Sequence, residues 1–204
     1  MKNITVHLIR HMKTGKAERD QDRKPNELGL QQMEQLAATI EEEGTKFDVI
    51  FYSPVDRARL LAERIAKSTT TLTPVEALYE PNPESPDRNE QLDAALMAKA
   101  NTLFGYDLEA WFSNHLVVDL ISRRMEAAKM RIDDAVRRHE GKSMRIGVVS
   151  HYVYLQELGE QLADRRDLLA FTKTHLGECD RLVLSFPEWP TAGAARLVKL
   201  GEKI

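Results

Sequence analysis

The hydrophobic positions of the chain fall into two patterns, short continuous apolar runs and longer stretches with apolar residues three or four apart. Short runs rich in β-branched residues are typical of buried strands, and the longer repeat is typical of helices with one buried face. The runs predict strands over residues 3–9, 47–52, 69–75, 144–150, 181–186 and 195–200. The repeats predict helices over residues 27–42, 54–66, 92–103, 108–112, 117–139 and 153–163.

Polar stretches that contain glycine and proline separate these elements. Residues 11–28 and 79–89 predict loops, the second because it contains three prolines. Ser53 and Pro54 are expected to form the N-cap and the first residue of the helix that follows them. Gly44 is expected to end the helix before it.

Strands that alternate with helices indicate a layered α/β fold with a mainly parallel sheet. No helix is predicted between 181–186 and 195–200, so these two strands are expected to form an antiparallel pair, and 69–75 is expected at an edge. The sequence has no internal repeat and no long linker. This favours one domain over residues 1–204, with about 88–117 as a helical insertion.

Composition excludes several classes of protein. The chain has 204 residues, enough to bury a core without disulfide support, and its single cysteine, Cys179, excludes an intramolecular disulfide framework and a four-cysteine zinc site. A net charge of −3 argues against a surface dedicated to nucleic acid or membrane. No apolar run approaches the ~18 residues of a membrane span, and Arg10 and Lys13 interrupt the apolar N-terminus, so no signal peptide is predicted. We therefore expect a cytoplasmic protein.

Candidate chemistry lies at the ends of the predicted strands. The first strand leads directly into Arg10 and His11, the second is followed within one helical turn by Arg57, and a later strand leads into His151. The carboxyl ends of parallel strands meet at one edge of the sheet, where ligands of open α/β folds bind. These four side chains are therefore expected to converge. Two guanidinium groups and two imidazoles suit an oxyanion such as phosphate.

The position of Arg57 adds a second indication. It falls early in a helix, where the helix dipole disfavours a cation and where a bound anion would use the free backbone N–H groups. Each residue alone also has a structural explanation: a histidine after a strand is more often structural, and Arg57 has Asp56 and Glu63 as possible ion-pair partners. The expected convergence of all four residues carries the prediction of an anion site.

Four segments resemble the histidine phosphatase, or phosphoglycerate mutase-like, superfamily. LIRHMKTG (residues 8–15) resembles its Arg-His-Gly signature, and NELGLQQMEQLA (26–37) resembles the helix after that loop. SPVDRARLLAERIA (53–66) is similar to its Ser-Pro-x-x-Arg-Ala stretch, and VVSHYVYLQEL (148–158) is similar to its second histidine motif. The four segments occur in the family's order.

The resemblance implies a three-layer α/β/α sandwich with a mostly parallel, mixed central sheet, and a phosphatase that needs no metal or other cofactor. It implies that His11 is the nucleophile, phosphorylated on a ring nitrogen, with Arg10, Arg57 and His151 around the phosphoryl group. His7 and His11 have the spacing of a helical zinc site, but a strand does not place such residues together, so no metal is expected there.

The family's general acid is a carboxyl group in the loop after the third strand. The carboxylates of that region are Glu76, Glu80, Glu84 and Asp87. The stretch ALYEP resembles the small SixA-like phosphohistidine phosphatases, in which this acid is not clearly matched. We expect Glu80 to be the acid, with Glu84 as the second choice. An ordinary solvated loop carboxylate is the alternative explanation for each.

Three residues depart from the family's pattern. Met12 stands where the family has glycine, and its bulk is expected to narrow the approach to the phosphate. Tyr152 follows the second histidine where glycine is common, and Ala17 stands where mutases have an asparagine that contacts substrate. These departures speak against mutase activity more than against phosphoryl transfer.

The remaining features have structural explanations. The arginine pairs 123–124 and 137–138 are expected to form the solvated face of the long helix. The aromatic residues of the insertion are expected in the core, with a roof over the pocket as the alternative; they are Phe104, Tyr106, Trp111 and Phe112. Cys179 is expected to be a buried, inert thiol.

The sequence thus favours a phosphatase that hydrolyses a phosphomonoester or a phosphorylated protein through a phosphohistidine on His11. One alternative is a phosphoglycerate-type mutase. Another is a catalytically weak phospho-ligand-binding protein, in which Met12 obstructs the attack and no general acid is in place. The expected partner in each case is a phosphorylated small molecule or a phosphoprotein, and neither a nucleic acid nor a membrane.

Overall fold

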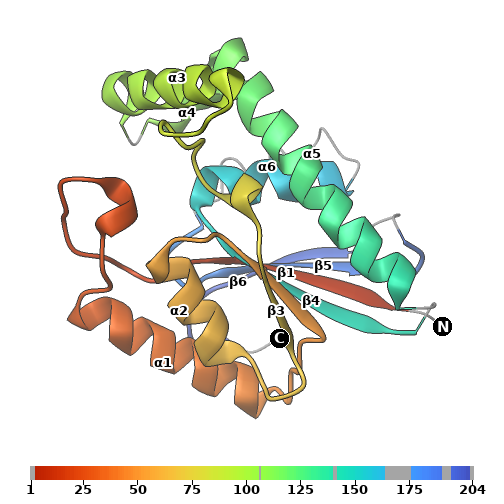
Figure 1. Ribbon diagram of the computed structural model, residues 1–204. Coiled ribbons are helices and arrows are strands. Elements are labelled where there is room, and N and C mark those ends of the chain that lie inside the picture. Colours follow the sequence, from red (N-terminus) through yellow and green to blue (C-terminus); the bar gives the residue numbers. More distant parts are fainter. Residues whose placement is uncertain (1–2, 106, 140–141, 164–175, 190–193, 203–204) are drawn as a thin grey trace.

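A single mixed sheet forms the centre of the protein (Figure 1). The computed structural model describes residues 3–105, 107–139, 142–163, 176–189 and 194–202. Within them the strands are β1 (Ile4–Arg10), β2 (Val49–Tyr52), β3 (Thr71–Pro74), β4 (Met144–Ser150), β5 (Arg181–Phe186) and β6 (Ala194–Val198). The helices are α1 (Glu27–Glu42), α2 (Asp56–Ile65), α3 (Arg88–Phe104), α4 (Leu108–Ser113), α5 (His115–Arg138) and α6 (Tyr152–Ala163). Two short 3-10 turns are η1 (Asp20–Asp22) and η2 (Glu76–Leu78).

The strands lie in the order β3-β2-β4-β1-β5-β6. The first four of these are parallel to one another, β5 is antiparallel to β1, and β6 is antiparallel to β5. The sheet is therefore mixed and mostly parallel, as the sequence predicted. The predicted edge strand and the predicted antiparallel pair lie at its two ends.

Helices cover both faces of the sheet, which gives the three-layer α/β/α sandwich that the family resemblance implied (Figure 1). Side chains of a strand alternate between its faces, so β1 serves two cores. Leu8 belongs to the core that α5 and α6 cover, together with Leu120. Ile9 belongs to the core under α1 and α2, together with Leu36.

Helix α1 illustrates how the sequence sets the ends of an element. The Asn26 side chain accepts a hydrogen bond of 2.8 Å from the backbone N–H of Gly29, which is the bond expected of an N-cap. Leu36 and Ile40, four residues apart, are buried. Gly44 follows the helix with a φ of 63°, which glycine adopts at little cost.

The predicted elements are confirmed within a few residues at their ends, with one correction that concerns the site. Ser53 and Pro54 do not begin α2; the helix starts at Asp56, and its N-cap, Val55, makes no side-chain bond. The Ser53 hydroxyl instead lies 3.1 Å from Nε2 of His151. Tyr106 lies outside the described residues. None of the described helices is long and apolar enough to span a bilayer.

Candidate active site

Three neighbouring parallel strands deliver the predicted residues to one edge of the sheet. Arg10, the last residue of β1, pairs in register with Ser150, the last residue of β4. The next residues of the two strands are therefore His11 and His151, and their ring centroids are 4.8 Å apart. Strand β2 ends beside β4 and leads into α2, which carries Arg57 as its second residue. The expected convergence at the carboxyl ends of the strands is thus observed.

The hydrogen bonding of His11 fixes its tautomer. Its Nδ1 lies 2.7 Å from the carbonyl oxygen of Met12, which can only accept a hydrogen bond. Nδ1 therefore carries the proton, and Nε2 keeps a lone pair. Burial, reinforced by the nearby Arg57, lowers the pKa of His11 to about 3. The imidazole is consequently neutral and nucleophilic at ordinary pH.

His151 lies between a serine and an arginine. The Arg57 guanidinium, which only donates, is 3.4 Å from its Nδ1, so Nδ1 accepts and the Nε2–H donates to Ser53. Burial, together with nearby His11 and Arg57, holds the pKa of His151 well below its usual value. The side chain of Arg57 is only 1% exposed, and its Nε has no hydrogen-bond partner among the described residues. A bound oxyanion would satisfy such a donor.

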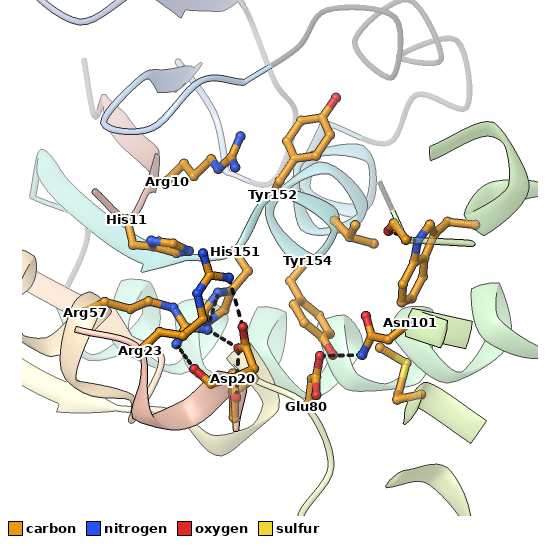
Figure 2. A pocket seen from close by; sticks show the side chains of 15 residues that line it. Arg10, His11, Asp20, Arg23, Arg57, Glu80, Asn101, His151, Tyr152 and Tyr154 are labelled. Atoms are coloured by element: carbon orange, nitrogen blue, oxygen red, sulfur yellow. Dashed lines mark hydrogen bonds and ion pairs between the residues drawn. The ribbon is translucent and has the colours of Figure 1, made fainter. Parts of the chain in front are cut away.

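Arg10 lies on the other side of His11 from Arg57 (Figure 2). Its Nη1 donates a 2.6 Å hydrogen bond to the carbonyl oxygen of Leu176, and its Nη2 lies 3.6 Å from a carboxylate oxygen of Glu178. The guanidinium also lies over the ring of Tyr152 at 5.5 Å. Its Nε, like that of Arg57, is buried without a partner among the described residues.

A carboxylate that the sequence did not single out lies among these cations. Asp20, in the loop after His11, pairs with Arg57 through its carboxylate and its carbonyl oxygen. It also accepts hydrogen bonds from Arg23 (3.1 Å) and from the Tyr79 hydroxyl (3.0 Å). Burial raises the pKa of Asp20, but Arg57, Arg23 and Tyr79 outweigh it and hold the pKa below its usual value. Asp20 therefore occupies donors that a phosphate group would use.

These residues line a cavity of about 390 Å³, within the range of ~300–1,000 Å³ usual for small-molecule sites. Glu80 also lines it and accepts a 2.9 Å hydrogen bond from the Asn101 amide. Burial raises the pKa of Glu80 above its usual value, as a general acid requires. Glu84 is exposed and does not line the cavity.

Helix α5 holds the segment that carries Tyr79 and Glu80. Arg124 donates a 2.9 Å hydrogen bond from Nε to the carbonyl oxygen of Tyr79 and a 2.6 Å bond from Nη2 to that of Glu76. The prediction of a solvated arginine pair is therefore wrong for Arg124. It holds for Arg123, whose side chain is 67% exposed.

The departures from the family's pattern have different consequences from those expected. Met12 is fully buried among the residues under α1 and α2 and does not line the cavity, so the expected narrowing of the phosphate approach is wrong. Its φ is not positive, so the position does not require glycine. Tyr152 lines the cavity, and Ala17 is exposed outside it. Cys179 is buried, as expected, and burial raises the pKa of its thiol to about 12.

The loop that carries Met12 and Asp20 rests on the first turn of α1. The Lys13 N–H donates a 3.0 Å hydrogen bond to the Gln32 side chain, and the Lys13 carbonyl accepts one of 3.3 Å from Asn26. A Cβ atom added at Gly29 would lie only 1.9 Å from the Lys13 carbonyl oxygen. Glycine is therefore required at this position for the helix to approach the loop.

The arrangement brings a neutral imidazole, three guanidinium groups and a carboxyl with a raised pKa together around one cavity. The structure brings the five predicted residues to this cavity, namely His11, His151, Arg10, Arg57 and Glu80. The sequence analysis did not single out Asp20 and Arg23, which also line it, or the contact of Ser53 with His151. Loop residues carry no periodic signal, so the sequence offered no indication of Asp20 or Arg23. Ser53 was interpreted as a helix cap because Ser-Pro is typical of that role.

The chain belongs to the Histidine phosphatase superfamily (branch 1), whose sequence pattern matches residues 6–191. This result agrees with the site's two histidines and its arginines. No curated protein sequence matches the chain significantly.

Solved structures share the fold over nearly the whole chain. A phosphoserine phosphatase from Entamoeba histolytica, crystallised with 3-phosphoglyceric acid, is 22% identical, with coverage of 98% of this chain and 100% of its own and a TM-score of 0.63. A phosphoglycerate mutase from Bacillus anthracis is 19% identical, with coverage of 98% and 94% and a TM-score of 0.64. The putative phosphohistidine phosphatase SixA from Agrobacterium tumefaciens is 18% identical, with coverage of 96% and 94% and a TM-score of 0.54.

Proposed function

We propose that the protein is a phosphatase that hydrolyses phosphorylated substrates through a phosphohistidine on His11, without help from a metal ion. The observation that carries the proposal is the environment of His11. Its ring lines the cavity with the lone pair on Nε2, and Arg10, Arg23 and Arg57 line the same cavity. A neutral nucleophile beside three cations suits attack on a dianionic phosphoryl group.

In the first step, the Nε2 lone pair of His11 attacks phosphorus, and the bond from phosphorus to the ester oxygen breaks. The guanidinium groups stabilise the charge on the equatorial oxygens, which is the main contribution that a protein makes to phosphoryl transfer. Glu80, whose pKa burial raises above its usual value, gives its proton to the leaving oxygen.

In the second step, water attacks the phosphorus of the phosphohistidine, and the P–N bond breaks. Glu80, now ionised, takes the proton from this water, so that phosphate leaves and the enzyme returns to its starting state. His151 keeps Arg57 oriented through the contact at its Nδ1. Ser53 fixes the tautomer that this contact needs.

The family supports a phosphatase, and the named activities of the similar structures include a phosphoserine phosphatase and a phosphohistidine phosphatase. A mutase also shares the fold. The two activities differ in the fate of the phosphoryl group. A phosphatase releases phosphate to water, whereas a mutase returns the group to another hydroxyl of the same sugar acid.

The test is phosphate release from p-nitrophenyl phosphate and from an alkyl phosphate, compared between wild type and His11→Ala. We expect His11→Ala to abolish both activities and the trapping of phosphate on the protein after an alkaline quench, which preserves phosphohistidine. EDTA is expected to leave wild-type turnover unchanged. Labelled 3-phosphoglycerate in the same assay detects any transfer to the 2-position.

His115→Ala is the matched control, because His115 is an exposed histidine at the start of α5. It is expected to retain full activity. Turnover that persists in His11→Ala, or that EDTA removes from the wild type, would contradict the mechanism.

A further inference from the structure

The cavity extends beyond the phosphate-binding residues to the helices α3 and α4. Its lining there includes Met97, Asn101 and Gly105 from α3 and its C-terminal end, and Trp111 from α4. Tyr154, from α6, lines the same end. Figure 2 shows Tyr154 and Asn101 beside Glu80, on the side away from Arg10 and His11. The group that leaves on phosphoryl transfer would occupy this end, because Glu80, the proposed acid, lies there and pairs with Asn101.

Tyr154 carries an unsatisfied polar atom at this end of the cavity. The residue is only 4% exposed, and its hydroxyl has no hydrogen-bond partner among the described residues. A buried hydroxyl without a partner is unfavourable, and the penalty disappears when an occupant of the cavity bonds to it. Two polar groups at this end of the cavity are already paired. The Asn101 amide donates a hydrogen bond to Glu80, and the Trp111 Nε1–H donates one of 3.0 Å to the Gly105 carbonyl oxygen.

The lining at this end of the cavity also includes aromatic and apolar side chains. Trp111 is 5% exposed and packs edge-on against Phe104, with ring centroids 6.0 Å apart. Met97 and the ring of Tyr154 complete the surface. Aromatic rings prefer stacked or edge-to-face partners, and a thioether packs well against aromatic rings. The shape and the chemistry therefore suit a planar ring with a hydrogen-bond acceptor at its edge.

We propose that the substrate is a small phosphomonoester whose alcohol carries a heteroaromatic ring, and that Tyr154 donates a hydrogen bond to an acceptor atom of that ring. This inference rests on the proposed phosphatase function and specifies its substrate class. Tyr154 is then a specificity-determining residue, with no part in the bond-breaking steps. The other class of substrate, a phosphorylated peptide, is an outcome of the test.

The test compares kcat/KM for ethyl phosphate, benzyl phosphate and the three isomeric pyridylmethyl phosphates, in wild type and Tyr154→Phe. We expect wild type to prefer the ring-bearing esters over ethyl phosphate by at least about tenfold, and one pyridylmethyl isomer over benzyl phosphate. Tyr154→Phe is expected to lower kcat/KM for that isomer by about two- to tenfold, as the loss of one neutral hydrogen bond implies. The readout is the ratio of kcat/KM for that isomer to kcat/KM for benzyl phosphate, which should fall by the same factor.

The comparison of wild type with Tyr154→Phe cancels differences in leaving-group acidity between the esters. Tyr52→Phe is the matched control, since Tyr52 packs beside the core under α1 and α2 and does not line the cavity. Equal loss with all esters, no selectivity among them, or faster hydrolysis of phosphohistidine or phosphoserine peptides would overturn the inference. If ethyl phosphate hydrolysis still depends on His11, the proposed phosphatase survives that result. If no ester is hydrolysed, the proposed phosphatase function itself is refuted, and not only the substrate class.

Discussion

The carboxylate of Asp20 is expected to compete with phosphate for the same cationic groups. It pairs with Arg57, Arg23 and the Tyr79 hydroxyl. A phosphate group that binds Arg57 must displace it. Asp20→Asn keeps the shape of the side chain and removes its charge, so it should weaken this internal competition and strengthen phosphate binding.

The size of the effect follows from the exposure of the two partners. Hydrogen bonds to charged groups contribute about 1.5–3 kcal/mol. The Arg57 side chain is 1% exposed but that of Asp20 is 40% exposed, so solvent screening reduces the contribution to the bottom of that range or below. A gain of about 1–1.4 kcal/mol corresponds to phosphate binding roughly five- to tenfold tighter.

The assay is competitive inhibition by inorganic phosphate, with isothermal titration of phosphate as a second measurement. Asp22→Asn is the control, because Asp22 belongs to the same turn but pairs with Arg19. Equal phosphate affinity in wild type and Asp20→Asn would refute the competition. Weaker binding in Asp20→Asn would show instead that Asp20 organises the guanidinium groups for the ligand.

Three further predictions concern positioning, pH and stability. Arg124→Met should lower kcat for alkyl phosphates by roughly ten- to a hundredfold and spare p-nitrophenyl phosphate, because the loosened segment misplaces Glu80; Arg123→Met should change neither rate. His11, with a pKa of about 3, stays neutral above about pH 4, so kcat/KM for alkyl phosphates should fall as pH rises through the raised pKa of Glu80. Glu80→Gln should remove this falling limb from the pH profile. Leu120→Ala, at a residue 1% exposed, should reduce the free energy of unfolding in urea by about 2–5 kcal/mol.

Each of these predictions has an outcome that contradicts it. Equal losses with alkyl and aryl phosphates in Arg124→Met would mean that Arg124 acts on the fold rather than on the acid. A falling limb that is the same in Glu80→Gln would assign the titration to another group. An unchanged free energy of unfolding in Leu120→Ala would place this side chain outside the core.

The site residues at the ends of the strands could be predicted, because their positions depend on the regular part of the fold. Buried parallel strands are recognisable as short apolar runs, and the residues after them meet at one edge. Arg10 and His151 were found in this way. Arg57 was found through its unusual position at a helix N-terminus.

The rest of the site depends on contacts between segments that no local pattern describes. The loop that carries Asp20 and Arg23 lies at the cavity because Arg57 of α2 donates a hydrogen bond to the Asp20 carbonyl oxygen. Arg124 is not part of the solvated face because its guanidinium donates hydrogen bonds to two backbone carbonyl groups. The direction of Met12 also escaped prediction. A side chain beside a nucleophile can point into the site or into the core, and here it points into the core.

The close packing of Gly29 against Lys13 links the start of helix α1 to the loop that follows His11. Position 29 lies outside the cavity, yet any side chain there must displace a backbone carbonyl two residues beyond His11. The position of helix α1 and the path of the backbone after His11 therefore depend on each other. A single methyl group at position 29 would force either the Lys13 carbonyl or the helix itself to shift.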